Sequence, residues 1–218
     1  MHPVIYRRFE ALLSQFPITG DVLEIGPSAD PQRSLLSILR ERGHEGALVG
    51  LDRVPREAND VYEVVVGDSH DLGDFQEHRF GAVISNATLE HDEAFWRSVA
   101  EISRVLAPGG LLFLGVPGFP TRSLADRWLA PLWRARSLAQ ATRKPPETRD
   151  RSLKERLIGS SLYSTTTTYR YHAAPGVGDY WRFSAQAVSE ILLRQFDILS
   201  VEEVHRPVRI LAVGRAQK

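Results

Sequence analysis

The sequence predicts a doubly wound α/β fold built on a mostly parallel sheet. Short apolar runs that end in polar or turn-forming residues alternate with longer runs whose apolar residues recur at helical spacing. Parallel neighbours need a connection long enough to hold a helix, so this alternation favours right-handed crossovers that cover both faces of the sheet. With 218 residues, 43% of them apolar, the chain is long enough for such a core, and we expect one domain over 1–218.

The elements follow in order along the chain. Val4 to Phe16 has apolar residues at helical spacing and Pro17 stops the run, so an amphipathic helix is expected to open the fold. Short apolar runs predict strands over 21–26, 47–52, 61–66, 80–85, 111–116, 196–204 and 208–213. Further helices are expected over 34–40, 93–106 and 185–193. The last two strands follow each other closely and are expected to pair as an antiparallel edge.

Composition narrows the classes of partner and compartment. The formal net charge is zero, so no global field steers the protein to nucleic acid, and no nucleic-acid partner is expected. The chain has no cysteine, which excludes disulfides and thiolate ligands, and no tight cluster of His and carboxylates predicts a metal. The N-terminus lacks the apolar core of a signal peptide, and no apolar run approaches the ~20 residues that cross a bilayer. We expect a cytoplasmic protein.

The regular alternation stops over 118–178, a segment far longer than an ordinary connection between strand and helix. The stretch from Thr121 to Ser160 contains ten Lys and Arg residues but only four Asp and Glu residues, so this insertion is basic. We interpret it as a lid that binds the substrate. Leucines, tryptophans and arginines interleave over 122–138, which suits a peripheral membrane contact, packing on the sheet or a dimer contact, so a monomer and a homodimer are both open.

Two strand ends carry the chemistry expected of a nucleoside site. Glu24-Ile25-Gly26-Pro27 closes the first strand, where a glycine lets the backbone approach a ligand closely. Asp52 ends the second strand, where a carboxylate can accept both hydroxyls of a ribose. A dinucleotide fold is the competing interpretation, but Ser28 and Pro31 stand where its fingerprint needs glycines. A ligand with one ribose and no pyrophosphate fits better.

Five segments in order resemble the successive motifs of class I S-adenosylmethionine (SAM)-dependent methyltransferases, of the bacterial type 11-like domain. They are VLEIGPSAD, LVGLD, VVVGDSHDL, FGAVISNATLEH and ISRVLAPGGLLFLGVP, and the resemblance resumes at DYWRFS from Asp179. It implies a Rossmann-like, seven-stranded fold and SAM as cofactor. The implied cofactor-binding residues are Glu24, Ile25, Gly26, Pro27, Asp52, Arg53, Gly67, Asp68, Ser69 and Asn86.

The resemblance also implies what each part of this set binds. Glu24 and Gly26 would lie by the methionine end of SAM, Asp52 would hold the ribose, and Asp68 with Ser69 would meet the adenine edge. Arg53 would flank the adenine, and Asn86 would lie beside the methyl donor. The first motif departs from the family pattern at Pro27 and Ser28.

Methyl transfer from a sulfonium needs alignment and exclusion of water more than a strong catalytic motif. A hydroxyl acceptor would benefit from a base, and the candidates are His91, His172 and Asp179; a carboxylate acceptor would need none. After the fourth strand the chain reads Ser85-Asn86-Ala87-Thr88, which lacks the asparagine-proline-proline-aromatic pattern of amino-methylating nucleic-acid enzymes.

We therefore expect a methyltransferase that acts on an oxygen of a small molecule, a sugar, glycan or secondary metabolite. The basic insertion suits an anionic acceptor. Two alternatives stay open from sequence: a SAM-binding scaffold without catalysis, and a nicotinamide-dependent reductase.

Overall fold

The strands described by the computed structural model form one seven-stranded sheet of order β3-β2-β1-β4-β5-β7-β6. The structure describes residues 1–119, 178–205 and 207–217. The insertion predicted over 118–178 lies outside these residues except at its two ends, and so do His172 and the stretch 122–138 that suits a membrane, sheet or dimer contact. Within the described residues, no helix is long and apolar enough to cross a membrane.

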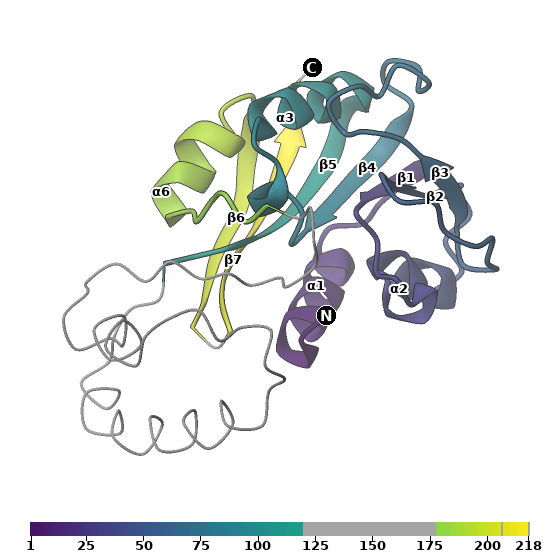
Figure 1. Cartoon of the computed structure of the whole chain (residues 1–218), viewed down its shortest axis with the longest axis horizontal. Helices are drawn as coiled ribbons and strands as arrows, with labels where there is room; N and C mark the ends of the chain where they lie inside the picture. Colours follow the sequence, from purple (N-terminus) through teal and green to yellow (C-terminus); the bar gives the residue numbers. More distant parts are fainter. Residues whose placement is uncertain (120–177, 206, 218) are drawn as a thin grey trace, which may run out of the picture. The chain divides into compact units, whose positions relative to one another are not determined.

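The first half of the chain builds the parallel part of the sheet (Figure 1). β1 pairs in parallel with β2 and β4, β2 with β3, and β4 with β5. The bounds along this half are α1 Pro3–Gln15, β1 Asp21–Ile25, η1 Pro31–Arg33, α2 Leu35–Glu41, β2 Leu48–Asp52, β3 Glu63–Val66, β4 Phe80–Asn86, η2 Leu89–His91, α3 Phe95–Val105 and β5 Leu106–Pro117. The prediction of a doubly wound, mostly parallel sheet is confirmed.

The last part of the chain adds an antiparallel hairpin. Its elements are α6 Ala185–Ala187, η4 Val188–Leu192, β6 Phe196–His205 and β7 Val208–Ala216. β7 runs antiparallel to both β5 and β6, so the predicted pairing is confirmed, with β6 as the outer strand. The helix expected over 185–193 changes to a π-helical turn at Val188, which places both Leu192 and Leu193 in the core.

Two other elements differ from prediction for local reasons. The strand expected to begin at Val61 begins at Glu63, because the amides of Val61 and Tyr62 donate to the Asn59 side chain in a turn. The strand expected over 111–116 begins earlier, at Leu106, because Leu106 already pairs with Phe80 before the register shifts. Gly109 accommodates that irregularity with a φ of 77°.

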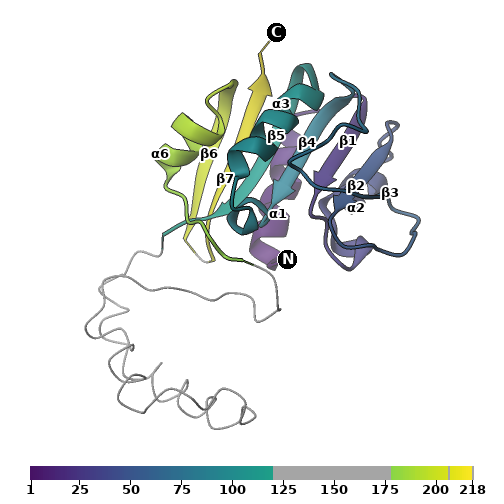
Figure 2. The ribbon, with the colours of Figure 1, turned by 45° about the horizontal axis from the view of Figure 1, so that its top comes forward.

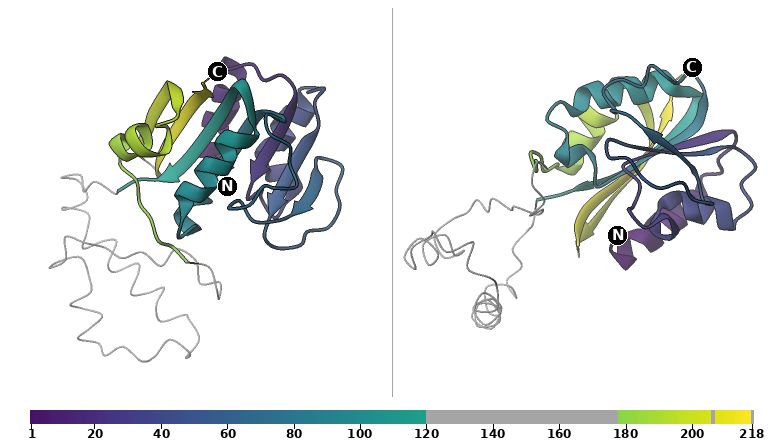
Figure 3. Two further views of the ribbon diagram at one scale, coloured as in Figure 1. Left: turned by 90° about the horizontal axis from the view of Figure 1, so that it is seen from above. Right: turned by 45° about the vertical axis from the view of Figure 1, so that its right-hand side comes forward.

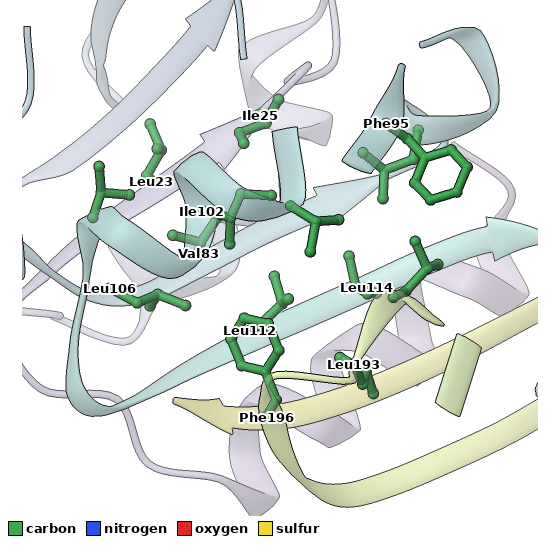
Figure 4. Packing of buried hydrophobic residues seen from close by; sticks show 14 of the residues in the cluster. Leu23, Ile25, Val83, Phe95, Ile102, Leu106, Leu112, Leu114, Leu193 and Phe196 are labelled. Carbon is green, nitrogen blue, oxygen red and sulfur yellow. The ribbon is translucent and has the colours of Figure 1, made fainter. Parts of the chain in front are cut away.

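Helices cover both faces of the sheet, as the crossovers require (Figures 2 and 3). α1 and α2 pack on one face, where Ile5, Phe9 and Leu36 share a buried cluster with strand residues. α3 and η4 pack on the other face, and Figure 4 shows how Ile102 and Leu193 meet the strands there. The sheet is thus buried on both faces, which leaves the ends of its strands for ligand binding.

We expect Ile102→Ala to lower the free energy of unfolding by about 2–5 kcal/mol, because Ile102 is fully buried between α3 and the sheet and the surroundings cannot fill the cavity. Chemical denaturation measures the change. Ile198→Ala is the matched control: Ile198 is 46% exposed on β6, so a change below about 1 kcal/mol is expected. Equal losses in the two variants would contradict this account of the core.

Candidate functional site

The predicted cofactor-binding residues gather at the carboxyl edge of the central strands. Ile25 of β1 pairs with Leu51 on one side and with Ser85 on the other, so these three strands end together. The order of strands reverses direction between β1 and β4. Open α/β sheets bind ligands at such a switch point, at the carboxyl ends of the strands.

Gly26 allows the loops after β1 and β4 to come together. Its φ is 69°, and a Cβ at this position would lie 2.5 Å from Thr88 Oγ1. The Thr88 hydroxyl donates to the Ile25 carbonyl at 3.1 Å, and the Gly26 amide donates to the Leu51 carbonyl at 2.9 Å. Any larger residue here would push the two loops apart.

Glu24 is buried and connects β1 to α2. Its Oε2 accepts hydrogen bonds from the Ser34 hydroxyl and, at 3.2 Å, from the Leu36 amide at the start of α2. Burial raises the pKa of the Glu24 carboxyl above its ordinary value of 4.5, and these hydrogen bonds oppose that rise. Ser34 also caps α2, so the carboxylate has a structural contact in addition to the predicted role toward the methionine end.

Asp52 ends β2 and is held by its own loop. Oδ1 accepts from the Val54 amide at 3.0 Å, and Oδ2 accepts from the Arg56 guanidinium, with Nε at 2.9 Å. Sequence reasoning did not single out Arg56. Its signal is the position four residues after the acid that ends the strand. Pro27 is buried near this place, with its ring 3.2 Å from where a Cβ on Gly50 would lie.

The loop after β3 places Asp68 beside Arg53. The Gly67 amide donates to the Asp52 carbonyl at 3.0 Å, which fixes the start of this loop against β2. Arg53 Nε lies 3.5 Å from Asp68 Oδ2, and both side chains are exposed. The Ser69 hydroxyl instead lies 2.8 Å from the Ser98 hydroxyl on α3. The two residues predicted to meet the adenine therefore have different surroundings.

Asn86 ends β4 with a buried side-chain oxygen. Among the described residues, no group hydrogen-bonds to Asn86 Oδ1. This oxygen lies over Gly115, where a Cβ would be 2.4 Å from it and 2.9 Å from the Phe9 ring. The adjacent Ser85 hydroxyl is also buried without a partner in the part of the chain that the structure describes. Unpaired buried polar atoms are rare, and they point to a ligand or water.

The two described candidate bases lie near each other in the fold but differ in environment. His91 Nδ1 lies 2.6 Å from the Gly178 carbonyl, which can only accept, so Nδ1 carries the proton and Nε2 is the basic nitrogen of the neutral ring. Asp179 binds both terminal nitrogens of Arg182 at 2.6 Å. Both oxygens of the Asp179 carboxylate therefore accept from one guanidinium.

Glu90 lies between Asn86 and the start of α3. Sequence reasoning did not single out its carboxylate. Its side chain is buried, with Oε1 3.8 Å from Arg209 on β7, and no described residue hydrogen-bonds to Oε2. Desolvation raises the pKa of the Glu90 carboxyl, and Arg209 opposes the rise. The available signal was an acid directly beside His91 at a strand end.

Comparison with known protein families finds a match, and it covers the part of the chain that forms the central strands. Residues 24–114 match the family described as "Methyltransferase domain". No curated protein matches the sequence. In the described residues, no group of three or more His, Asp or Glu side chains is arranged to hold a metal ion.

Solved structures share the fold at low sequence identity. An N1-methyltransferase of Burkholderia thailandensis, crystallised with 1,6-didemethyltoxoflavin and S-adenosylhomocysteine, is 18% identical with a TM-score of 0.61 over 98% of this chain and 78% of its own. A SAM-dependent methyltransferase of Methanosarcina mazei is 18% identical, with a TM-score of 0.52 over 100% and 98%. The CurJ carbon methyltransferase is 15% identical, with a TM-score of 0.57 over 99% and 54%.

We expect Glu90→Gln to raise stability at neutral pH. The folded state raises the pKa of Glu90 above the value of 4.5 that we assign to the unfolded chain, so the wild type loses stability as pH rises through that unfolded value. The variant keeps the shape without the charge, so its advantage in melting temperature grows above pH ~4.5 and then levels off once the folded carboxyl ionises.

Glu93→Gln is the control for this effect, because Glu93 lies three residues away and is exposed. Thermal unfolding of the three proteins from pH 4 to 8 measures the difference. A Glu90→Gln protein that is less stable than wild type across this range would show that the charge is well solvated or well paired in the fold.

Proposed function

With a methyltransferase domain over residues 24–114 and the fold of class I enzymes, this chain is a SAM-dependent methyltransferase, and we propose that it methylates an oxygen of a small hydroxylated molecule. The supporting observation is Glu90 Oε2, a buried carboxylate oxygen to which no described residue hydrogen-bonds. Glu90 follows β4 and directly precedes the candidate base His91. Such oxygens need donors, and a hydroxyl supplies one where an ionised carboxylate does not.

The residues at the carboxyl edge fit SAM. An orphaned acceptor such as Asn86 Oδ1 suits a ligand with an ammonium group and a positive sulfur. Asp52 Oδ2 already accepts from two Arg56 nitrogens and Oδ1 from one amide, so Oδ1 can take one ribose hydroxyl while Arg56 stays in place. Binding of both hydroxyls requires Arg56 to give up one bond.

We assign the remaining cofactor contacts to the other residues of the first and third motifs. Gly26 and its neighbours Glu24, Ile25 and Pro27 line the methionine side, and Gly67 with Asp68 and Ser69 lines the adenine side. Arg53 flanks the adenine. Each of these residues lies at or next to the carboxyl end of β1, β2 or β3.

SAM supplies an electrophilic methyl group on a sulfonium. Glu90 Oε2 would accept a hydrogen bond from another donor of the acceptor molecule, and His91 Nε2 would take the proton of the methylated hydroxyl. The oxygen–methyl bond would form as the sulfur–methyl bond breaks, with S-adenosylhomocysteine as the leaving group. The Gly178 carbonyl holds the imidazole in the tautomer that this step requires. Asp179 is the less suitable base because Arg182 holds both of its oxygens.

The basic insertion supports an acceptor that also carries negative charge. Ten Lys and Arg against four Asp and Glu between Thr121 and Ser160 favour a phosphate or carboxylate group at a distance from the methylated oxygen. A sugar phosphate, a nucleotide-linked sugar and a lipid-linked glycan all have this chemistry. We therefore propose that 118–178 binds the acceptor and acts as its lid, with His172 as a second candidate base.

The cofactor is tested by thermal unfolding with SAM, S-adenosylhomocysteine, NAD and NADP. We expect the first two to raise the melting temperature, because a ligand that binds the folded state stabilises it. Asp52→Ala should remove the shift, whereas Asp74→Ala, an exposed acid in the loop after β3, should retain it. A shift with NAD alone, or none with SAM, would refute the proposal.

The base is tested with His91→Asn in a screen of hydroxylated and anionic acceptors. Asparagine keeps a donor toward the Gly178 carbonyl but cannot take a proton, so kcat should fall about 10²–10⁴-fold while S-adenosylhomocysteine affinity stays unchanged. His172→Asn is the parallel variant. A kcat that falls only in the His172 variant would move the role of base to that residue.

A further inference from the structure

The loop after β3, residues 68–75, forms hydrogen bonds at two separate places with α3 and the residues just before it. At its far end, Glu101 accepts from the Leu72 amide at 2.8 Å, and Arg104 donates to the carbonyls of Leu72 and Phe75. At its near end, His70 and Ser69 reach Asp92 and Ser98. The two attachments use different residues, so one can be removed while the other remains.

The near attachment centres on the carboxylate of Asp92. Asp92 Oδ1 accepts from His70 Nε2 at 2.5 Å and from the Ala94 amide at 2.8 Å, and Oδ2 accepts from the Ser98 hydroxyl at 2.6 Å. The Asp92 side chain is 9% exposed and that of His70 is 19% exposed. A carboxylate with this many donors at such low exposure has a fixed position.

His70 also contacts Asp68, so the position of Asp92 and the position of Asp68 are linked through His70. The His70 amide donates to Asp68 Oδ1 at 2.9 Å, and the ring nitrogen Nδ1 lies 3.8 Å from the same oxygen. Asp68 Oδ1 is therefore held from one side. Oδ2 faces Arg53 Nε at 3.5 Å, and the Arg53 side chain is 74% exposed. Of the two oxygens, Oδ2 is the one available to a ligand.

We infer that His70, clamped on Asp92, is a positioning residue that sets the specificity of Asp68 for a ligand with an exocyclic amine, the adenine of the cofactor. This inference rests on the proposed function, in which Asp68 accepts from that amine. The clamp fixes the direction of the Asp68 carboxylate before the cofactor arrives, so less ordering is needed on binding.

The same clamp reaches the acceptor side of the site. The Trp181 indole donates to the Asp92 carbonyl at 2.8 Å, and the Trp181 ring packs edge-on against Phe95 at 5.4 Å between centroids. Asp92 thus contacts the loop after β3, the start of α3 and the segment that follows the insertion. Movement of Asp92 would displace each of these three segments.

The test compares binding of S-adenosylhomocysteine and S-inosylhomocysteine by calorimetry. The second ligand replaces the exocyclic amine with a carbonyl oxygen, which Asp68 cannot accept from. Wild type should prefer the adenine ligand by at least about tenfold. His70→Phe keeps a ring but has no donor, so this preference should shrink by about tenfold, chiefly through weaker binding of S-adenosylhomocysteine.

Three further variants separate positioning from general damage. His70→Gln restores a donor toward Asp92 and should recover most of the preference, and Ser98→Ala, which removes one donor from Asp92, should lower it by about threefold. Arg104→Ala removes the far attachment and should lower the melting temperature while leaving the preference intact.

The outcomes distinguish the inference from the proposed function. Wild type that binds neither ligand overturns the proposed function and the inference with it. Wild type that binds both equally overturns the role of Asp68. Wild type that discriminates, with an unchanged preference in His70→Phe or an equal loss for both ligands, overturns the inference alone, and so does a loss of preference in Arg104→Ala.

Discussion

The parallel pairing of β1 with both β2 and β4 is the constraint on which the rest of the site depends. Ile25 lies in register with Leu51 and with Ser85, so three strands that are distant in sequence end side by side. The loops that follow must then share a small space, and Gly26 allows it by leaving room for Thr88. The polar ends of the strands consequently face one ligand-binding edge.

The buried acids near this edge show how differently one residue type can be used. Glu24 receives a hydroxyl and an amide from the start of α2, which compensates part of its desolvation. Glu90 has a buried oxygen to which no described residue donates, and its ion pair with Arg209 spans 3.8 Å. A carboxylate that folding leaves unsatisfied is costly, and such a cost is typical of residues retained for function.

Local pattern and residue chemistry could predict much of this architecture. The apolar run at Asp21–Ile25 and the acid that ends β2 are properties of neighbouring residues, and each lies where it was predicted. The contact of His70 with Asp92 could not be predicted in this way. His70 and Asp92 are 22 residues apart, and their contact depends on the paths of two loops and the start of α3.

The acceptor that we propose combines two chemical preferences that come from different parts of the chain. The buried Glu90 Oε2 has no donor among the described residues, and an ionised carboxylate on the acceptor could not supply one. The composition of the insertion instead favours negative charge. Neither a simple alcohol nor a small carboxylate meets both. A molecule with hydroxyl groups at one end and an anionic group at the other would meet both, because a hydroxyl can donate to Glu90 Oε2 while the charge can bind arginine or lysine.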